Sequence, residues 1–513
     1  MTIMAAIGCM MILSLRAPAS SSIFANQHLN VDVTASQSST TLEASSTPIK
    51  PYNFENAILS AKAFRHDFYF FVYDASSDAF FVIHIDGPCR FNCGRLQGVA
   101  PTLAVALRKN FPQRFQGKQD LVLMISVEDL PRIKRKCLLA ENNYCDSVLF
   151  APILQFGSVF MNTDYLPSMI AMPMPVRPHL PCFNDWQLSD FGTMRGTCPE
   201  LQLQQYYNAT SSQDYWDNLI PQIIWRGSDF NFLPLLFPDM RRPAYMVDIP
   251  QHELGLDGRQ FANEYEKKRW AIETLWAMGE EKLMPRWRGV LMTSEAELEM
   301  IIEDDQEMVG SNRTVPWVNI KFTHINDGGL KKLASEVEEY QMLQNIGISC
   351  IGDVMTISDH AKYKYHIDLG GGGGTTWTGT IQKLALPGVL FHHVTPTKDW
   401  FHDLLIPWEH YIPIKTDLSD LHEKYEWAES HPEEARRISE NGTRFAQWMA
   451  SVEGFGQLYE AYLAAPLRNV ITAYNYPSPL EHGNKRVLDL IFERGNDKFT
   501  VVYKCMRAQG CAP

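Results

Sequence analysis

Lysine and arginine are outnumbered by acidic residues in this sequence. The 513 residues include 46 Lys and Arg against 59 Asp and Glu, so the net charge is -13 and the pI about 5.6. Proteins that bind nucleic acid usually present a basic face. The composition therefore argues against nucleic acid as a partner. An anionic ligand would have to be held by a few specifically placed cations or by backbone N–H groups.

Familiar nucleotide and metal motifs are missing as well. The sequence has no G-x-G-x-x-G fingerprint, no Walker loop and no Asp-x-Asp pair after a predicted strand. Cys89 and Cys93 are spaced as zinc ligands can be, but no matching His or Cys pair follows them. We therefore expect neither a metal nor a cofactor.

Charge is also absent from the N-terminus, where residues 1–15 are apolar. A helix of that length spans roughly 23 Å, less than the ~30 Å hydrocarbon core of a membrane. Small residues follow, so residues 1–25 are predicted to be a signal peptide, with a signal anchor, and hence membrane attachment, as the alternative. Residues 26–52, rich in Ser and Thr, are predicted to be a stem.

Sequons and cysteines agree with the secretory pathway. N-x-S/T sequons occur at Asn208, Asn312 and Asn441, the last inside a predicted helix. Apart from Cys9, the cysteines form four local couples that could be oxidised, with Cys350 left over: Cys89/Cys93, Cys137/Cys145, Cys182/Cys198 and Cys505/Cys511. The final residues, GCAP, are not an ER-retrieval signal, which favours the Golgi or secretion over the ER lumen.

The body of the chain is predicted to be α/β, because three short apolar runs end in polar or glycine residues. The run at 121–127, typical of a strand in a parallel sheet, precedes Glu128 and Asp129. The run at 223–225 precedes Arg226, Gly227 and Ser228. The run at 363–369 precedes five glycines. Ligands of open α/β sheets bind outside the carboxyl ends of strands, so these segments are candidate site residues.

The glycine run, Gly370–Gly374, is predicted to join a strand to a helix. Trp377, Ile381, Leu384 and Ala385 follow at helical spacing, and an apolar run resumes at Val389. In such a βαβ unit the helix N-terminus offers unpaired N–H groups, and glycines let a phosphate approach the backbone. The segment is therefore a candidate diphosphate site.

Other clusters have plainer interpretations. Ser430 to Glu433 matches a capping box that would start a helix. Arg286 and Arg288 are expected in a surface loop. Of His392 and His393, one is expected to be packed and the other exposed.

Four segments together resemble glycosyltransferase family 90, the capsule-associated and protein O-glucosyltransferase (Rumi-like) enzymes. They are IIWRGS at 223–228, KYKYHIDL at 362–369, TTWTGTIQKLAL at 375–386 and PWEHYIPIKTDLSDL at 407–421. The resemblance covers about residues 119–450. It implies a GT-B fold of two Rossmann-like domains facing across a cleft, with an acceptor-side domain at 53–215, a nucleotide-sugar domain at 216–470 and an extension at 471–513.

The resemblance also assigns roles to residues. Asp129 matches the family's catalytic base. The implied donor-binding residues are Arg226, Gly227, Ser228, Gly371, Gly372, Gly373, Gly374, Thr375, Thr376, Trp377, Thr378, Thr380 and Lys383. The family carries an arginine where this chain has Thr380, so a diphosphate contact is missing or replaced, with Lys383 as one replacement.

The implied activity is an inverting, metal-independent transfer of a sugar, glucose or xylose, from a UDP-sugar to a hydroxyl of a protein or polysaccharide. A carboxylate base would take the acceptor proton, while cations and N–H donors would stabilise the departing UDP. Two alternatives remain. One is a catalytically weak or silent luminal protein that acts as a scaffold, in which Thr380 in place of the arginine has reduced the activity. The other is a glycan-binding module without a nucleotide pocket.

Overall fold

The computed structural model describes the following residues: 58, 69–84, 87, 93–116, 119–128, 153–155, 159–160, 169–171, 213–234, 236–240, 242, 260–277, 279, 282–305, 314–327, 330–376, 378–399, 401–450, 454, 457–458, 460–472, 485–494, 500–506 and 510–512. The predicted leader and stem, Asp129, Trp377, and the sequons at Asn208 and Asn312 lie outside this set. Among the described residues, no helix has the length and apolar character needed to span a membrane.

The first sheet has seven strands in the order β15-β14-β2-β1-β3-β4-β6. β1 pairs with β2 and β3 in antiparallel register, whereas β3, β4 and β6 run parallel. The sheet is thus mixed, and the strand predicted for a parallel sheet has one antiparallel neighbour. The strands are β1 (Tyr69–Asp74), β2 (Ala79–His84), β3 (Leu121–Ser126), β4 (Ile153–Gln155), β6 (Met169–Ala171), β14 (Thr500–Met506) and β15 (Gly510–Ala512).

The core of this sheet combines segments from both ends of the chain. β1, β2 and β3 are buried along their whole length: all but the last residue of each strand is aromatic or aliphatic, and the last residues, Asp74, His84 and Ser126, are buried polar groups. Four helical segments contribute side chains to the same apolar cluster: α2 (Cys93–Asn110), the π-helical turn η8 (Glu460–Ala464), α15 (Ala465–Thr472) and α17 (Val487–Arg494).

The tail after residue 471, expected to be an extension, supplies two strands to the first sheet. β14 pairs with β2, and β15 pairs with β14. The register places Cys505 directly opposite Cys511, the couple that the spacing predicted. Sequence patterns alone did not indicate that the tail returns to a sheet begun more than 400 residues earlier.

The second sheet has six strands in the order β13-β11-β10-β7-β8-β9. All neighbours are parallel except β8 and β9. The strands are β7 (Ile220–Asp229), β8 (Val318–Asp327), β9 (Leu330–Leu333), β10 (Tyr363–Asp368), β11 (Val389–His393) and β13 (Ile412–Ile414); β5 (Val159–Phe160) and β12 (Thr397–Lys398) form a separate two-stranded sheet. The predicted βαβ unit is confirmed, since β10 and β11 are parallel neighbours.

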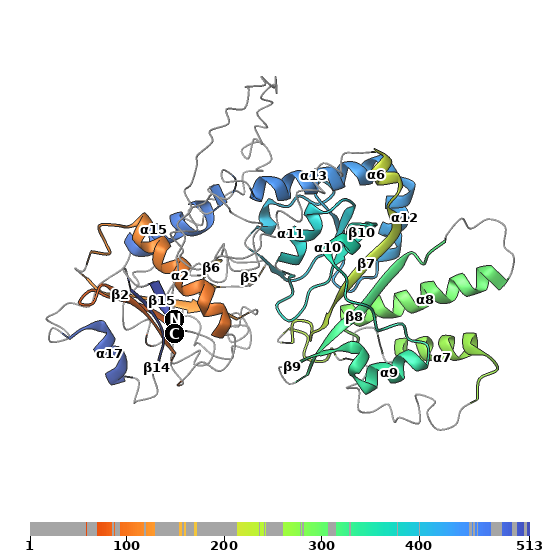
Figure 1. Ribbon diagram of the computed structural model, residues 1–513, viewed down its shortest axis with the longest axis horizontal. Helices are drawn as coiled ribbons and strands as arrows, with labels where there is room; N and C mark the ends of the chain where they lie inside the picture. The colour runs from red at the N-terminus through yellow and green to blue at the C-terminus, as the bar shows by residue number, and fades with distance from the viewer. Residues whose placement is uncertain are drawn as a thin grey trace, which may run out of the picture. The chain divides into compact units, whose positions relative to one another are not determined.

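Helices cover both faces of the second sheet, and Figure 1 shows α11 beside α13 with α7 and α8 near β8. Val389 and Phe391 of β11 join the cluster that contains α8, while Leu390 joins the cluster of α11 and α13. Side chains alternate along a strand, so an apolar run fills both faces. The helices are α6 (Gln213–Asp217), α7 (Glu264–Trp276), α8 (Pro285–Asp305), α9 (Glu338–Asn345), α10 (Ile357–His360), α11 (Thr378–Ala385), α12 (Leu421–Ser430) and α13 (Pro432–Ala450), with 3-10 turns η6 (Ala334–Glu336) and η7 (His402–Leu404).

A helix begins at Pro432, where the pattern at 430–433 predicts one, but the predicted serine cap is wrong. Ser430 does not cap α13: its hydroxyl donates to the carbonyls of Glu426 and Trp427 at the end of α12. A capping box does start α10, where Thr356 and Asp359 exchange hydrogen bonds. The predicted cap is absent because the serine hydroxyl is bonded to carbonyls in the last turn of α12.

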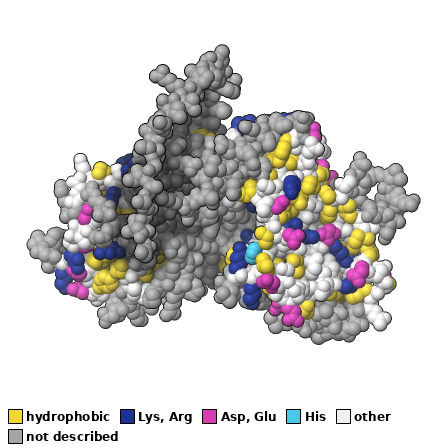
Figure 2. Space-filling view, viewed as in Figure 1, with side chains coloured by type: hydrophobic (Ala, Val, Ile, Leu, Met, Phe, Trp, Pro, Cys, Tyr) yellow, Lys and Arg dark blue, Asp and Glu magenta, His cyan; other side chains and the backbone are white. Residues whose placement is uncertain are grey.

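The second lobe, which is the part of the chain built around the second sheet, carries both signs of charge on its surface. On the face seen in Figure 2, acidic and basic side chains lie interspersed rather than gathered by sign. On α7, Lys267 pairs with Glu264 and Arg269 with Glu273 at helical spacing. Such exposed pairs stabilise a helix by only a few tenths of a kcal/mol, roughly 0.3–0.5, so they keep the surface solvated rather than fix the fold.

Candidate functional site

The carboxyl end of β10 presents a buried carboxylate, Asp368, which is 1% exposed. Its Oδ2 accepts hydrogen bonds from His392 Nδ1 over 2.8 Å and from the Thr380 hydroxyl over 2.5 Å. Its Oδ1 accepts the backbone N–H of His393 over 2.9 Å. Although burial favours the neutral acid, attraction to His392 and these hydrogen bonds lower the pKa of Asp368 to about 2. The carboxylate is therefore ionised, and both of its oxygens accept hydrogen bonds from the protein itself.

Thr380 belongs to this network. It is buried on α11, and its hydroxyl also lies 2.8 Å from that of Thr376. Where the resemblance implies an arginine, the chain has a neutral side chain that is already bonded to a carboxylate. Thr378 begins α11, and Lys383, one turn beyond Gly379, donates to the Gly379 carbonyl over 3.3 Å. Burial lowers the pKa of Lys383, and attraction to Asp368 opposes that shift.

The glycine run packs tightly against the protein. A Cβ on Gly370 would lie 2.3 Å from the Gly374 carbonyl oxygen, and one on Gly371 would lie 2.9 Å from the Arg286 guanidinium. Gly374 has a φ of +81° and sits against the Thr397 hydroxyl, which donates to the Gly373 carbonyl. Gly372 is the most open member, with one neighbouring atom at 3.7 Å. Only glycine fits most of this loop because the chain folds back on itself there.

Arg286 lies beneath the loop, so its predicted place in a surface loop is wrong. It sits in the first turn of α8 and is 7% exposed. It donates to the Leu369 carbonyl over 2.7 Å and to the Ser228 carbonyl over 2.5 Å, and its guanidinium lies 5.1 Å from the Trp225 ring. Burial lowers the pKa of Arg286 to about 10, so it stays protonated at neutral pH. A cation therefore lies where the strands β7 and β10 end.

Arg226, Gly227 and Ser228 lie inside β7, which runs on to Asp229, rather than in a loop after it. Arg226 Nη1 donates to the carbonyls of Trp225 and Asn319, and burial lowers the pKa of Arg226. Gly227 is required because the Trp225 indole covers it, at 2.4 Å from where a Cβ would stand. The extra strand residues pair with β8 through a register shift between Gly227 and Ser228, which the apolar run did not signal.

His393 links the loop to the next strand. It is 2% exposed; its Nδ1 accepts the Gly370 N–H over 3.1 Å, and its Nε2 donates to the Thr416 carbonyl over 2.8 Å. Burial lowers the pKa of His393 to about 4, so the ring is neutral. The side chain of His392 is only 13% exposed. Both histidines are thus largely packed, and the expectation of one exposed ring is wrong.

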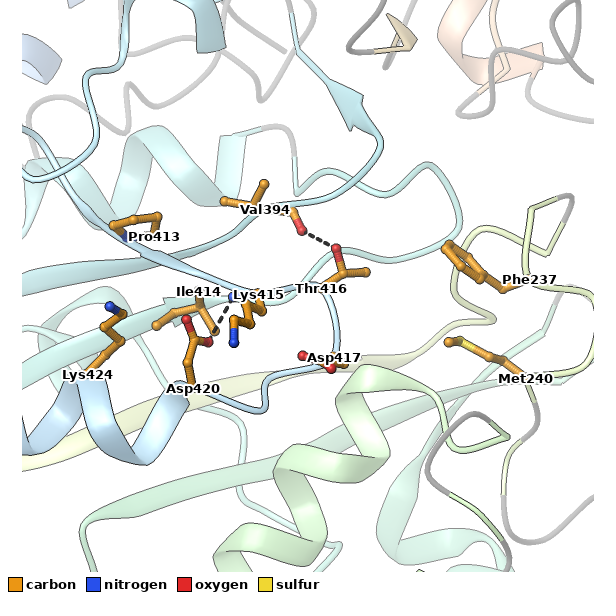
Figure 3. A pocket seen from close by; sticks show the side chains of 10 residues that line it. All are labelled: Phe237, Met240, Val394, Pro413, Ile414, Lys415, Thr416, Asp417, Asp420 and Lys424. Atoms are coloured by element: carbon orange, nitrogen blue, oxygen red, sulfur yellow. Dashed lines mark hydrogen bonds between the residues drawn. The ribbon is translucent and has the colours of Figure 1, made fainter.

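An open pocket of about 650 Å³ lies at the carboxyl ends of β11 and β13 (Figure 3). This volume falls in the range of ligand sites, about 300–1,000 Å³. The lining is part apolar and part charged: Phe237, Met240, Val394, Pro413, Ile414, Lys415, Thr416, Asp417, Asp420 and Lys424. Thr416 bonds the Val394 carbonyl, and Asp420 bonds the Lys415 N–H, as dashed lines show. Sequence reasoning did not single these residues out, although the 407–421 segment contains several of them.

A second hollow, beside the glycine loop, is too narrow to admit a water molecule. It is lined by Asp368, Gly370, Gly374, Thr375, Thr376, His392, His393, Thr395, Thr397 and His402. The described residues contain no group of three or more His, Cys, Asp or Glu side chains placed to hold a metal ion. The arrangement offers N–H and hydroxyl donors, a buried arginine nearby and an adjoining open pocket.

Comparison with known proteins places this region in a family. Residues 337–459 match the model of glycosyl transferase family 90. Protein O-glucosyltransferase 2 of Danio rerio is 40% identical over 95 residues, which are 17% of each chain. Protein O-glucosyltransferase 1 of Homo sapiens is 34% identical over 105 residues, 20% of this chain and 26% of that protein.

These alignments cover between 17% and 26% of the relatives' own length. The matched segment holds β10, the glycine loop, Asp368, His392 and most of the open pocket. Residues 337–459, which hold most of the candidate site, are therefore similar to glycosyl transferase family 90.

Proposed function

We propose that this protein is an inverting glycosyltransferase of the secretory pathway, resident in the Golgi or ER lumen or secreted. It would move glucose or xylose from a UDP-sugar to a hydroxyl of a protein or polysaccharide, without a metal. The supporting observation is that the family match coincides with the carboxyl edge of the second sheet, where the glycine loop and the open pocket lie. The relatives named for O-glucosyl transfer favour glucose and a protein acceptor.

The proposal assigns the donor to this edge of the sheet. The open pocket suits the nucleoside, because it combines apolar walls with the carboxylates Asp417 and Asp420, which can accept ribose hydroxyls. The diphosphate would lie at the N-terminus of α11, near Arg286, where fixed positive charge stabilises the departing UDP. Facing domains of GT-B type complete the proposed architecture.

Asp129 is the proposed base. β3 ends at Ser126 and is followed by buried Val127 and half-buried Glu128, so Asp129 is the third residue after the strand in sequence. Asp129 itself lies outside the described residues. As general base it would take the proton of the acceptor hydroxyl as the oxygen attacks the anomeric carbon and UDP leaves.

The test measures sugar transfer and UDP release from UDP-glucose and UDP-xylose. We expect Asp129→Asn to lower transfer by about 10²- to 10⁴-fold while UDP affinity stays unchanged. Glu128→Gln is the matched control, because it removes the neighbouring carboxylate and should leave the rate within about threefold. Equal rates for wild type and Asp129→Asn would remove Asp129 from the mechanism.

A silent scaffold protein is the second candidate. Thr380 stands where the family has an arginine, and its hydroxyl is committed to Asp368. A protein that binds UDP but neither hydrolyses nor transfers any UDP-sugar would favour this alternative. A protein that binds no uridine nucleotide would favour a glycan-binding module.

A further inference from the structure

The segment that follows β7 folds back onto the glycine loop. Leu233, which is fully buried, has a φ of +36°, a conformation that a leucine rarely adopts. Its N–H donates to the Gly371 carbonyl over 3.3 Å, and a Cβ on Gly374 would lie 3.0 Å from its methyl carbons. Backbone strain of this kind persists only where the surrounding structure enforces it. The contacts with the glycine loop therefore fix the direction in which the chain continues.

Two successive turns then bring Phe237 and Met240 to the open pocket. The N–H of Phe237 donates to the Leu233 carbonyl over 3.0 Å, and the N–H of Met240 donates to the Phe237 carbonyl over 3.3 Å. Both side chains line the pocket, and Figure 3 shows them on one side of it, with Pro413 and Lys424 on the other. Phe237 and Met240 lie outside the matched segment 337–459, so the family comparison assigns them no role.

The Phe237 ring is supported by a second aromatic ring. Phe232, which is 1% exposed, stacks on it with ring centroids 5.4 Å apart and an angle of 22° between the planes. Phe232 in turn lies 5.4 Å from the His393 ring at the end of β11. Phe237 itself is half-buried, and it is the one aromatic side chain among the described residues that line the pocket. The pocket therefore offers one flat, rigid apolar surface to a ligand.

The charge and polarity of the pocket favour a neutral planar group at this surface. Two lysines and two aspartates line the pocket, so the lining carries no net positive charge that would hold a diphosphate. A hexose carries hydroxyls around its ring, and the side chains of Phe237, Met240 and Val394 cannot pair with them. A nucleobase has its hydrogen-bonding groups at the edge of the ring and leaves its faces for stacking. This side of the pocket therefore matches the base of a nucleotide.

We propose that the base of the donor nucleotide stacks on Phe237, with Met240 as an adaptable apolar wall beside it. The inference rests on the proposed function, which assigns the nucleoside to the open pocket, and it adds a donor-binding residue outside the matched segment. It also gives the glycine loop a second role, because the loop holds the Leu233 turn that positions Phe237. Every base has a face that can stack, so Phe237 supplies affinity, and the choice of uracil falls to polar groups of the pocket.

The test compares UDP with dihydrouridine diphosphate, whose saturated ring keeps the hydrogen-bonding edge of uracil but is neither planar nor aromatic. Affinities are measured by calorimetry for the full chain and for Phe237→Leu, which keeps an apolar side chain and removes the ring. We expect wild type to prefer UDP by about 3- to 10-fold, and this preference to fall below about twofold in Phe237→Leu. UDP itself should bind about 5- to 30-fold more weakly to the variant.

Two variants are the controls. Phe237→Tyr keeps the ring and should retain the UDP affinity and the preference for UDP within about twofold. Phe261→Leu removes another half-buried phenylalanine, which packs against Trp270 and is not among the described residues that line the pocket. It should change neither quantity. Uridine should lose as much affinity as UDP in Phe237→Leu, because both molecules carry the base.

An equal loss of affinity for UDP and dihydrouridine diphosphate in Phe237→Leu would overturn the inference, since Phe237 would then act only on the shape of the pocket. If wild type binds UDP and Phe237→Leu keeps both the affinity and the preference, the inference fails and the proposed function stands. If wild type binds no nucleotide, both fail together. If wild type binds GDP instead of UDP, and Phe237→Leu weakens the binding of GDP but not of pyrophosphate, the inference stands and the proposed donor is wrong.

Discussion

Replacing Asp368 by asparagine tests how much the buried carboxylate stabilises the second lobe. The substitution keeps the shape of the side chain and removes its charge. One amide oxygen then faces the donors His392 Nδ1, Thr380 Oγ1 and the His393 N–H, and the amide nitrogen can accept none of them. Losing charge-assisted bonds and leaving a buried donor unpaired should lower the free energy of unfolding by about 2–3 kcal/mol at pH 6.

The pH dependence follows from the lowered pKa of Asp368. A pKa of about 2 in the folded protein, against about 3.9 in the unfolded chain, stabilises the fold by about 2.6 kcal/mol. This stabilisation is complete above the unfolded pKa and is lost as the pH falls towards the folded pKa. Between pH 6 and pH 3 the difference between wild type and Asp368→Asn should therefore shrink by about 1 kcal/mol.

Urea unfolding followed by tryptophan fluorescence is a suitable assay, because every tryptophan except Trp186 lies at residue 216 or later. Asp403→Asn is the matched control: Asp403 pairs with Lys398, but its side chain is 56% exposed, so we expect a change below about 0.5 kcal/mol. A stability of Asp368→Asn equal to that of wild type, or a difference that is the same at pH 6 and pH 3, would refute the reasoning.

Four further outcomes are expected. Arg286→Met should destabilise the second lobe by about 2 kcal/mol in urea unfolding, because the carbonyls of Leu369 and Ser228 each lose a hydrogen bond from a charged donor. Gly374→Ala should cost more than about 1 kcal/mol in the same assay, since φ is +81° and the Thr397 hydroxyl lies where the Cβ would stand. Cys350, whose pKa burial raises to about 12, should react with a thiol reagent at pH 8 only when urea unfolds the protein. The neutral His393, with a pKa lowered to about 4 by burial, should make wild type lose stability as the pH falls from about 6.5 towards 4, and His393→Gln should reduce that loss.

Part of the candidate site could be predicted from the sequence. The five glycines between two apolar runs predicted a βαβ unit, and β10, α11 and β11 confirm it. The four segments that resemble family 90 led to the same family as the comparison. The sequence did not reveal what the glycines approach, since Arg286 lies 85 residues before Gly371, which it contacts, and Thr397 lies 23 residues after Gly374.

The misplacement of Arg286 has a physical cause. In the sequence it follows a proline and precedes Trp287 and a second arginine, a pattern that exposed turns share. In the fold, the first turn of α8 brings it under the ends of β7 and β10, where two carbonyls compensate for its burial. Whether a cation is exposed or buried depends on which distant backbone groups can receive its hydrogen bonds.

The sequence by itself determined the α/β class of fold, the βαβ unit of β10, α11 and β11, and the similarity of residues 337–459 to family 90, because periodicity and local motifs are properties of neighbouring residues. Only the tertiary structure decided that the tail completes the first sheet, that Thr380 bonds Asp368 and that Arg286 lies beneath the glycine loop. Each of these depends on which groups from remote segments meet. Hydrogen bonding and burial depend on which distant segments come into contact, and local sequence patterns do not specify those contacts.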